Sequence, residues 1–306
     1  MQPELQNSPL VTLLLPTALA IIMMALGLSL TPADFARVVK APRAVLVGLF
    51  CQVLLLPFAC YLITRGFGLT GALAVGMMLL SASPGGASAN LFSHLARGDV
   101  ALNITLTAVN SVVSLVTLPL ILGLSLSAFM GEERTVPLQA TKVLQVFAIV
   151  LVPVSLGMLV RAKKPELAKR LDRPIRIASV VFLLLIMAGA LIKERERLPD
   201  YFQGVGLAAL AFNLVSLAAG YWVPQLFKVE RRQAIAIGME IGVHNGTLAI
   251  AIASSPLLLN NAQMAVPAAI YSVIMFCTAA AFSWFLSRGA DSEDDDVEPD
   301  QNAAAA

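Results

Sequence analysis

The sequence predicts an all-α polytopic membrane protein with nine transmembrane helices, and three observations point to this fold class. Of the 306 residues, 58% are apolar and 13% are charged, whereas a soluble globular chain carries about 25% charged residues. The mean hydropathy is +0.81. The charges are clustered, so that apolar blocks as long as a membrane-spanning helix remain between them. Together these observations exclude an ordinary soluble protein.

Each expected transmembrane helix is an apolar block that ends at charged residues or at Pro and Gly, because irregular backbone is not stable in contact with lipid. The blocks run over 9–31, 42–66, 69–96, 98–130, 136–161, 175–193, 202–227, 231–256 and 262–288. The first block differs from a cleavable signal peptide, since Glu4 stands where basic residues are expected. We therefore expect it to remain in the mature protein.

The positions of Lys and Arg predict the orientation, because cytoplasmic loops are enriched in these residues. With nine spans, 15 of the bases fall on the side that holds the C-terminus and 6 fall on the other side. The N-terminus is therefore expected outside and the C-terminus in the cytoplasm, and the basic residues need no nucleic-acid partner to explain them. In this interpretation residues 1–290 form one transmembrane domain and 291–306 form a disordered acidic tail.

Two of the expected spans are interrupted near their middle by residues that disfavour a helix. The stretch 83–90 reads Ser-Pro-Gly-Gly-Ala-Ser-Ala-Asn, and 240–247 reads Glu-Ile-Gly-Val-His-Asn-Gly-Thr. Unwound backbone inside a membrane is tolerated where it lines a cavity or binds a ligand. Each break falls in the third span of a set of four, which predicts two inverted-topology repeats, about 9–130 and about 175–288, joined by a helix over about 136–161. Such paired breaks predict a secondary transporter, and kinks for helix packing are the alternative.

Glu240 is the one acidic residue deep inside an expected span. An ionised group there costs from a few to more than about ten kcal/mol, so it must be protonated, paired or bound to a cation. No Lys or Arg lies at this depth, and a cation is the natural partner. Further oxygen donors are Asn90 and, on one face of the span 98–130, Asn103, Thr107, Asn110 or Ser111, and Ser114. Ligands with oxygen alone favour an alkali or alkaline-earth ion, and interhelical hydrogen bonding is the alternative role for Asn103 and Thr107.

The two breaks also predict a place for an anion. The half-helices that follow them have positive N-terminal ends, which favour a negatively charged group. Their first residues are the expected substrate ligands: Ala87, Ser88, Asn245, Gly246 and Thr247. Gln52, in the middle of the span 42–66, is a further polar group near this point. The sequence therefore predicts cation sites beside an anion site.

Several of these stretches resemble the bile acid:sodium symporter family. They are residues 24–35, 83–90, 95–102 and Glu240 with Gly242, Asn245 and Gly246. The resemblance implies a core domain with two crossing discontinuous helices, a panel domain, and location in the inner (plasma) membrane of a bacterium. The chain looks like a nine-span form of a family whose members have nine or ten spans.

The resemblance also implies two sodium sites. The first would use Ala89 through its carbonyl, with Asn90, Asn103, Thr107 and Glu240; the second would use Gln52, Glu240, Ile241, Val243 and His244. Relatives often have Ser in place of Ala89 and Asn103, and Gln in place of His244. A neutral imidazole is a poor sodium ligand but titrates near physiological pH. The second site is therefore expected to be weakened or proton-linked, unless His244 donates a hydrogen bond from a packed position.

The expected function is sodium-coupled symport of an organic anion by alternating access, with one or two Na⁺ ions and no organic cofactor. Bile-acid-like, keto-acid and pantoate-like carboxylates are the candidate substrates, although Ile274, Met275 and Phe276 replace a Trp-His-Asn motif of relatives and argue against a bile acid. A proton-coupled or sodium-independent permease or exporter on the same scaffold is the alternative. An intramembrane enzyme is more remote, since His-Glu-x-x-His and Gly-x-Ser-x-Gly motifs are absent. The expected partners are the anion and the lipid bilayer, and the oligomeric state is left open.

Overall fold

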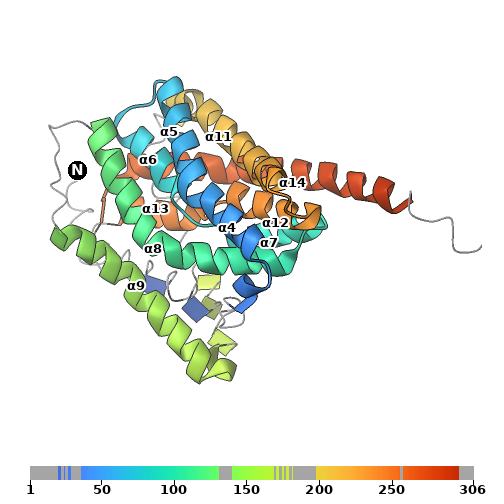
Figure 1. Ribbon diagram of the computed structural model, residues 1–306. Coiled ribbons are helices and arrows are strands. Elements are labelled where there is room, and N and C mark those ends of the chain that lie inside the picture. Colours follow the sequence, from blue (N-terminus) through green and yellow to red (C-terminus); the bar gives the residue numbers. More distant parts are fainter. Residues whose placement is uncertain are drawn as a thin grey trace, which may run out of the picture.

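The computed structural model describes residues 36–130, 140–168, 198–255 and 258–295, with isolated positions between 20 and 28 and between 170 and 181. The regular structure of this part is helical, and its one β feature is an isolated bridge. The elements shown in Figure 1 are η1 (Arg37–Val39), α4 (Pro42–Phe50), η2 (Cys51–Leu55), α5 (Leu56–Gly66), α6 (Gly71–Ser81), α7 (Ala87–Leu95), α8 (Val100–Met130), α9 (Ala140–Lys163), α11 (Leu198–Leu226), α12 (Arg231–Gly242), α13 (Gly246–Ser254) and α14 (Ala262–Asp295).

Four helical stretches of the described part are long and apolar enough to cross a membrane. They are Pro42–Gly66, Val100–Met130, Phe202–Leu226 and Ala262–Arg288, and they coincide with spans expected from the sequence. Helix α9 coincides with the expected linking helix, whereas the spans 9–31 and 175–193 lie mostly outside the described residues. The described part is therefore helical, with apolar spans as a polytopic membrane protein requires, and the count of nine spans, the repeats and the core and panel domains stay predictions.

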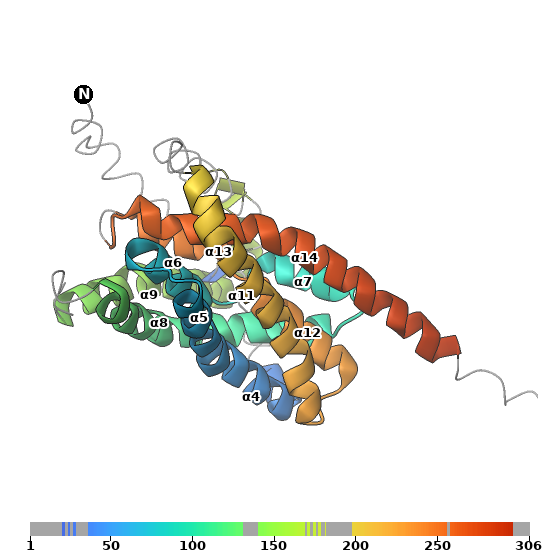
Figure 2. The same ribbon diagram turned by 90° about the horizontal axis from the view of Figure 1, so that it is seen from above.

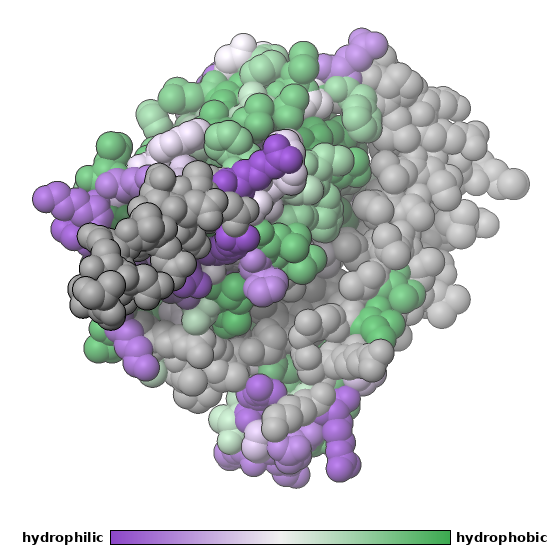
Figure 3. All heavy atoms as spheres, turned by 90° about the vertical axis from the view of Figure 1, so that its right-hand side faces the viewer, coloured by the Kyte–Doolittle hydropathy of each residue, from purple (hydrophilic) through white to green (hydrophobic). Residues whose placement is uncertain are grey.

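Apolar side chains cover the outside of the span formed by α4, η2 and α5. Every fourth residue is exposed and apolar, as a lipid-facing helix requires: Leu46, Phe50, Leu54, Phe58 and Leu62. The face seen in Figure 3 also carries a broad apolar area in its upper part, and hydrophilic residues lie at the left, near the middle and at the bottom. This distribution fits a surface in contact with lipid tails.

The two expected helix breaks are present, and they cross each other. Helix α6 ends at Ser81 before α7 begins, and α12 ends at Gly242 before α13 begins. Between them Gly85 and His244 form an antiparallel bridge. The two hydrogen bonds run from Gly86 N–H to the Val243 carbonyl and from Asn245 N–H to the Pro84 carbonyl, both at 2.8 Å. Each break thus satisfies backbone groups of the other, which lipid is unable to do.

Helix α14 lies against both discontinuous helices and extends beyond them. It contacts α6, α7, α11 and α13, and α11 also packs on α12. Figure 2 shows α14 running alongside α7 and α13, with its last turns projecting away from the other helices. Because α14 continues to Asp295, the first residues of the expected tail are helical, which differs from the expectation of disorder from residue 291. Residues 296–306 lie outside the described part.

Helices α8 and α12 run parallel to each other from their first turns. Three successive contacts join residues that are 133 positions apart in the chain. They link Asp99 N–H to the Arg232 carbonyl (2.9 Å), Asn103 Nδ2 to the Ala236 carbonyl (2.7 Å) and Thr107 Oγ1 to Glu240 Oε2 (2.5 Å). This register brings the carboxylate of α12 onto the polar face of α8.

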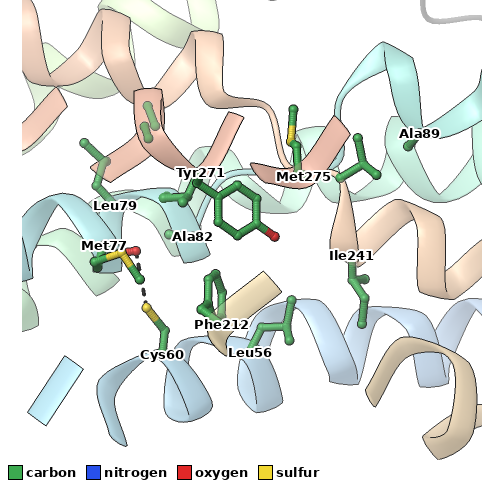
Figure 4. Close-up of a cluster of buried hydrophobic side chains, with 14 of the residues drawn as sticks. Leu56, Cys60, Met77, Leu79, Ala82, Ala89, Phe212, Ile241, Tyr271 and Met275 are labelled. Carbon is green, nitrogen blue, oxygen red and sulfur yellow. Dashed lines mark hydrogen bonds between the residues drawn. The ribbon is translucent and has the colours of Figure 1, made fainter. Parts of the chain in front are cut away.

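A cluster of buried apolar side chains lies beside the crossing. Figure 4 shows Tyr271 next to Phe212 in this cluster, with its hydroxyl directed toward the segment that carries Ile241. The Cys60 thiol donates to the Met77 carbonyl at 3.4 Å and links α5 to α6. The cluster supports one side of the second break.

Candidate functional site

Glu240 lies in the last turns of α12 and is 0% exposed. Its Oε2 lies 2.5 Å from Thr107 Oγ1, and its Oε1 accepts from Asn110 Nδ2 at 3.2 Å. The backbone of Gly85, in the other break, lies directly against the carboxyl group. A Cβ added at Gly85 would overlap the carboxyl group of Glu240. In the described part of the chain the carboxylate is therefore held by neutral donors, and glycine at 85 leaves room for it.

Two asparagines of the expected first sodium site present amide oxygens that have no protein partner. Asn103 is buried, and its Nδ2 donates to the Ala236 carbonyl, which fixes the orientation of the amide. The Oδ1 atoms of Asn90 and Asn103 are both buried and lack a hydrogen-bond partner. Since buried polar atoms almost always have one, these oxygens require a donor or a cation.

Gln52 reaches the first break from a wide helical turn. In η2 the Leu56 N–H bonds to the Cys51 carbonyl, five residues back, instead of four. Pro57 follows directly, and a proline has no N–H and clashes with the carbonyl four residues before it, which explains the wider turn. Gln52 Nε2 donates to the carbonyls of Ser81 (3.2 Å) and Ser83 (3.0 Å), which the end of α6 leaves free. Its Oε1 is buried without a partner.

His244 faces the same carbonyl from the second break. Its Nδ1 lies 3.1 Å from the Ser83 oxygen, and because a carbonyl only accepts, Nδ1 carries the hydrogen and Nε2 is an acceptor. The ring stacks on Phe212 at 5.6 Å between centroids and lies 5.4 Å from the ring of Tyr271. His244 Nε2 is buried and lacks a partner. The structure thus brings His244 and Gln52 together at the Ser83 carbonyl.

The remaining residues expected at the sodium sites are buried beside the crossing. Ala89, Ile241 and Val243 are each 0% exposed. The Val243 carbonyl already accepts from Gly86 N–H, which leaves one lone pair for another partner. Val243 thus takes part in the bridge between the breaks, and Ala89 and Ile241 are enclosed by the protein.

The residues expected to hold the anion differ in their surroundings. Helix α7 begins without a side-chain cap, whereas Asn245 caps α13 by accepting from Leu248 N–H at 3.1 Å. Ser88 and Thr247 are partly exposed, and Gly246 packs against the hydroxyl of Ser272. The side chain of Ala87 lies outside the described residues. The N-terminal end of α7 therefore keeps N–H groups that no side chain caps, whereas the Leu248 N–H of α13 is already bonded to Asn245.

Two residues that the sequence did not single out hold the second break. Asn213 Nδ2 donates to the Gly242 carbonyl at 2.9 Å, and the Tyr271 hydroxyl donates to the same oxygen at 2.8 Å. Thr278 Oγ1 in turn donates to Asn213 Oδ1 at 2.5 Å. The signal that was available is a lone Asn in the middle of an apolar span, which needs a partner inside the protein.

The donor set of the site consists mainly of oxygen atoms. Among the described residues, no group of three or more His, Cys, Asp and Glu side chains is placed to hold a metal. Transition metals favour the nitrogen of His and the sulfur of Cys, whereas carboxylate, carbonyl and amide oxygens suit hard cations. The site at the crossing therefore fits an alkali ion better than a transition metal.

Two crossing broken helices around a buried carboxylate are typical of secondary transporters of the membrane. Residues 16–200 match the model of the Sodium Bile acid symporter family, and the chain belongs to this family. The match confirms the resemblance found in the sequence.

Three curated relatives indicate the range of the family. The chain is 27% identical to the "Uncharacterized sodium-dependent transporter YocS" of Bacillus subtilis over 83% of this chain and 77% of the relative. It is 27% identical to the "Probable sodium/metabolite cotransporter BASS2, chloroplastic" of Oryza sativa subsp. japonica over 92% of this chain and 66% of the relative. It is 30% identical to the human "P3 protein" over 80% of this chain and 51% of the relative.

Proposed function

We propose that the protein is a symporter that couples the entry of sodium to the uptake of a small organic anion by alternating access. One observation carries this proposal: Glu240 is buried beside amide oxygens that have no partner in the protein. The unpartnered amide and imidazole atoms around the crossing are Gln52 Oε1, Asn90 Oδ1, Asn103 Oδ1, Asn110 Oδ1 and His244 Nε2. All of these atoms are acceptors without a donor. A cation supplies the positive charge that such buried acceptors need.

The first sodium ion would bind between the two breaks and α8. Its ligands are the carboxylate of Glu240, the amide oxygens of Asn90 and Asn103, the hydroxyl of Thr107 and the carbonyl of Ala89. The register of α8 and α12 supports this assignment, because it places Asn103 and Thr107 beside the turn that carries Glu240. A single carboxylate matches the single charge of sodium.

The second sodium ion would bind on the side of the crossing that faces Gln52. Its ligands are Gln52 Oε1, Glu240, the backbone of Ile241 and Val243, and His244. Gln52 and His244 share the Ser83 carbonyl, and each keeps one unpartnered acceptor, which supports a weak site at this point.

The substrate is a small organic anion such as a keto-acid, pantoate-like or bile-acid-like carboxylate. It would bind at the starts of α7 and α13, which meet at the crossing, near Ala87, Ser88, Asn245, Gly246 and Thr247. The uncapped N–H groups of α7 suit a carboxylate. Ions that stabilise the crossing would favour the arrangement that binds the anion, and this shared preference is the coupling.

In the proposed inverted repeats the two broken helices are equivalent, and both follow the same kind of turn, which also occurs at Arg97 before α8. Gly68 (φ 69°) and Lys228 (φ 56°) both adopt the left-handed conformation three residues before a broken helix begins, at Gly71 and Arg231. The residues after these two positions, Leu69 and Val229, are each bonded by their N–H to a carbonyl five residues back. Such repeats allow alternating access, because one repeat can rock against the other around the site. In the proposed orientation the N-terminus lies outside and the C-terminus lies in the cytoplasm of a bacterial cell.

The direct test is uptake into proteoliposomes with the pH and the membrane potential clamped. A tenfold inward sodium gradient stores about 1.4 kcal/mol per ion, so we expect about tenfold accumulation of a transported monoanion for one sodium and about a hundredfold for two. If accumulation of the anion does not depend on the sodium gradient but does depend on a pH gradient, the protein is the proton-coupled alternative instead.

His244 is the residue that favours the proton-coupled alternative. Its titratable ring lies among the acceptors of the second sodium site. Protonation of Nε2 would place a positive charge there and repel sodium, so the parent is expected to need more sodium at lower pH. A His244→Gln variant keeps a donor for the Ser83 carbonyl and an acceptor beside it, and it should show higher sodium affinity and a flatter pH dependence. Equal sodium and pH dependence of variant and parent uptake would mean that His244 is a packing residue.

A further inference from the structure

We propose that Asn110 is a ligand of the coupling cation, with its Nδ2 holding the carboxylate of Glu240 and its Oδ1 binding the ion. The proposal rests on the sodium-coupled function proposed above and adds a residue to its first cation site. Asn110 lies three positions after Thr107 on α8, so the two side chains share one face of the helix.

The contacts of Asn110 fix the direction of its amide group. Its side chain is 2% exposed, and Nδ2 donates to Glu240 Oε1 at 3.2 Å. Because an ionised carboxylate only accepts, the nitrogen must be the atom that faces Glu240. Oδ1 is then directed elsewhere, and it is buried with no partner in the described part of the chain. An amide whose nitrogen is bonded and whose buried oxygen has no partner lacks a cation or a donor for that oxygen.

The neighbouring hydroxyls on this face of α8 are already engaged. Ser111 Oγ donates to the Thr107 carbonyl at 2.6 Å, and Ser114 Oγ donates to the Ser111 carbonyl at 2.8 Å. These are bonds within the helix, of the kind that buried Ser side chains commonly make. Asn110, by contrast, contacts the Glu240 carboxylate and keeps a buried oxygen without any partner, so the choice between Asn110 and Ser111 falls on Asn110.

Asn103 and Asn110 have the same chemistry on the two sides of Thr107. Each donates one amide hydrogen to an acceptor of α12, the Ala236 carbonyl or the Glu240 carboxylate, and each keeps a buried Oδ1 without a partner. Neutral amide oxygens raise the number of ligands without adding charge, which suits a monovalent ion beside one carboxylate. A side chain held by Glu240 is also pre-positioned for the ion.

Thermal unfolding of the purified full-length chain in detergent tests the proposal, with NaCl replaced stepwise by choline chloride at constant ionic strength. We expect sodium to stabilise the parent, and Asn110→Leu to raise the half-saturating sodium concentration by about tenfold or more. Asn110→Asp would place a second carboxyl group beside Glu240, and the two are expected to share one proton because carboxylates this close do not both ionise. The variant then keeps a hydrogen toward Glu240 and an oxygen toward the ion, so it should retain sodium binding better than Asn110→Leu does. Thr105→Val is the matched control, because Thr105 is a buried hydroxyl on α8 that bonds to the Ala101 carbonyl of its own helix.

Each outcome decides the assignment. If Asn110→Leu binds sodium as the parent does, Asn110 is no ligand, and the proposed function stands on Glu240. If Asn110→Asp binds sodium as weakly as Asn110→Leu, an oxygen at this position does not bind the ion, and the ligand assignment is wrong. Should Asn110→Leu fail to fold, the comparison of Asn110→Asp with Asn110→Ser decides in its place, since Ser is too short to reach the carboxylate and the ion together. If sodium does not stabilise the parent, the proposed function and this inference are both overturned.

Discussion

Replacement of Glu240 by glutamine is expected to abolish sodium-driven uptake while the protein still inserts into the membrane. The carboxylate is the one negative charge that the described residues bring to the crossing, and removal of one partner of a buried ion pair costs about 3–5 kcal/mol. The added NH₂ group would also face donors, the Thr107 hydroxyl or the Asn110 amide. A loss of about 3 kcal/mol corresponds to more than about a hundredfold in sodium affinity.

The measurements are sodium-dependent uptake and sodium-dependent thermal stability, made on the same preparations. Glu230→Gln is the matched control, because Glu230 precedes the first turn of the same helix and is exposed. It should leave both measurements unchanged. Sodium-driven uptake by Glu240→Gln at the rate of the parent would contradict the proposed cation site.

The breaks and the buried acid could be predicted from the sequence, whereas their partners could not. Pro84, Gly85 and Gly242 disfavour a helix through local chemistry, so the positions of the breaks follow from the residues themselves. The pairing of Gly86 with Val243 depends on how two distant segments cross, and no local pattern contains it. The oxygen-rich face of α8 is likewise visible in the sequence. Which of its oxygens have no hydrogen-bond partner depends on how α12 packs against it, and the sequence alone does not show this.

Two details of the candidate site show how local geometry changes the role of a residue. Asn245 is predicted to lie near the anion, and its oxygen also caps α13 because Asn is a favoured residue at the start of a helix. Gln52 is predicted near the site, and it lies in a wide helical turn before Pro57. From this turn its amide nitrogen donates to the carbonyls of Ser81 and Ser83 at the end of α6. Both contacts depend on the conformation of a single turn of backbone. The apolar pattern along a span predicts the helix but not the conformation of one turn within it.

Substitution of Gly85 by alanine is expected to disrupt cation binding nearly as strongly as the loss of the carboxylate. The new methyl group would overlap the carboxyl group of Glu240, so either the carboxylate or the crossing must move. Overpacking of this kind costs about 1–3 kcal/mol, and sodium affinity should fall by a similar amount because the displaced group is the ligand. Sodium titrations of thermal stability measure this loss.

Two other glycines provide graded controls for this substitution. A Cβ at Gly204 of α11 meets no atom within 4 Å, so Gly204→Ala should bind sodium as the parent does. A Cβ at Gly86 would lie 3.3 Å from the His244 carbonyl oxygen, which is tight but allows a small shift, and Gly86→Ala should have an intermediate effect. An effect of Gly85→Ala no larger than that of Gly204→Ala would contradict the predicted overlap.

A double substitution separates overlap with Glu240 from general damage to the crossing. Glu240→Asp shortens the side chain by one methylene and withdraws the carboxylate from the space that a methyl group at 85 would take. If the overlap is the cause, Gly85→Ala should cost less sodium affinity in the Glu240→Asp background than in the parent, and the two substitutions should be non-additive by about 1 kcal/mol or more. Strict additivity would show that alanine at 85 acts on the backbone bridge to His244 instead. Because Gly85 and Glu240 belong to different broken helices, non-additivity would also show that the two breaks bind the cation as one unit.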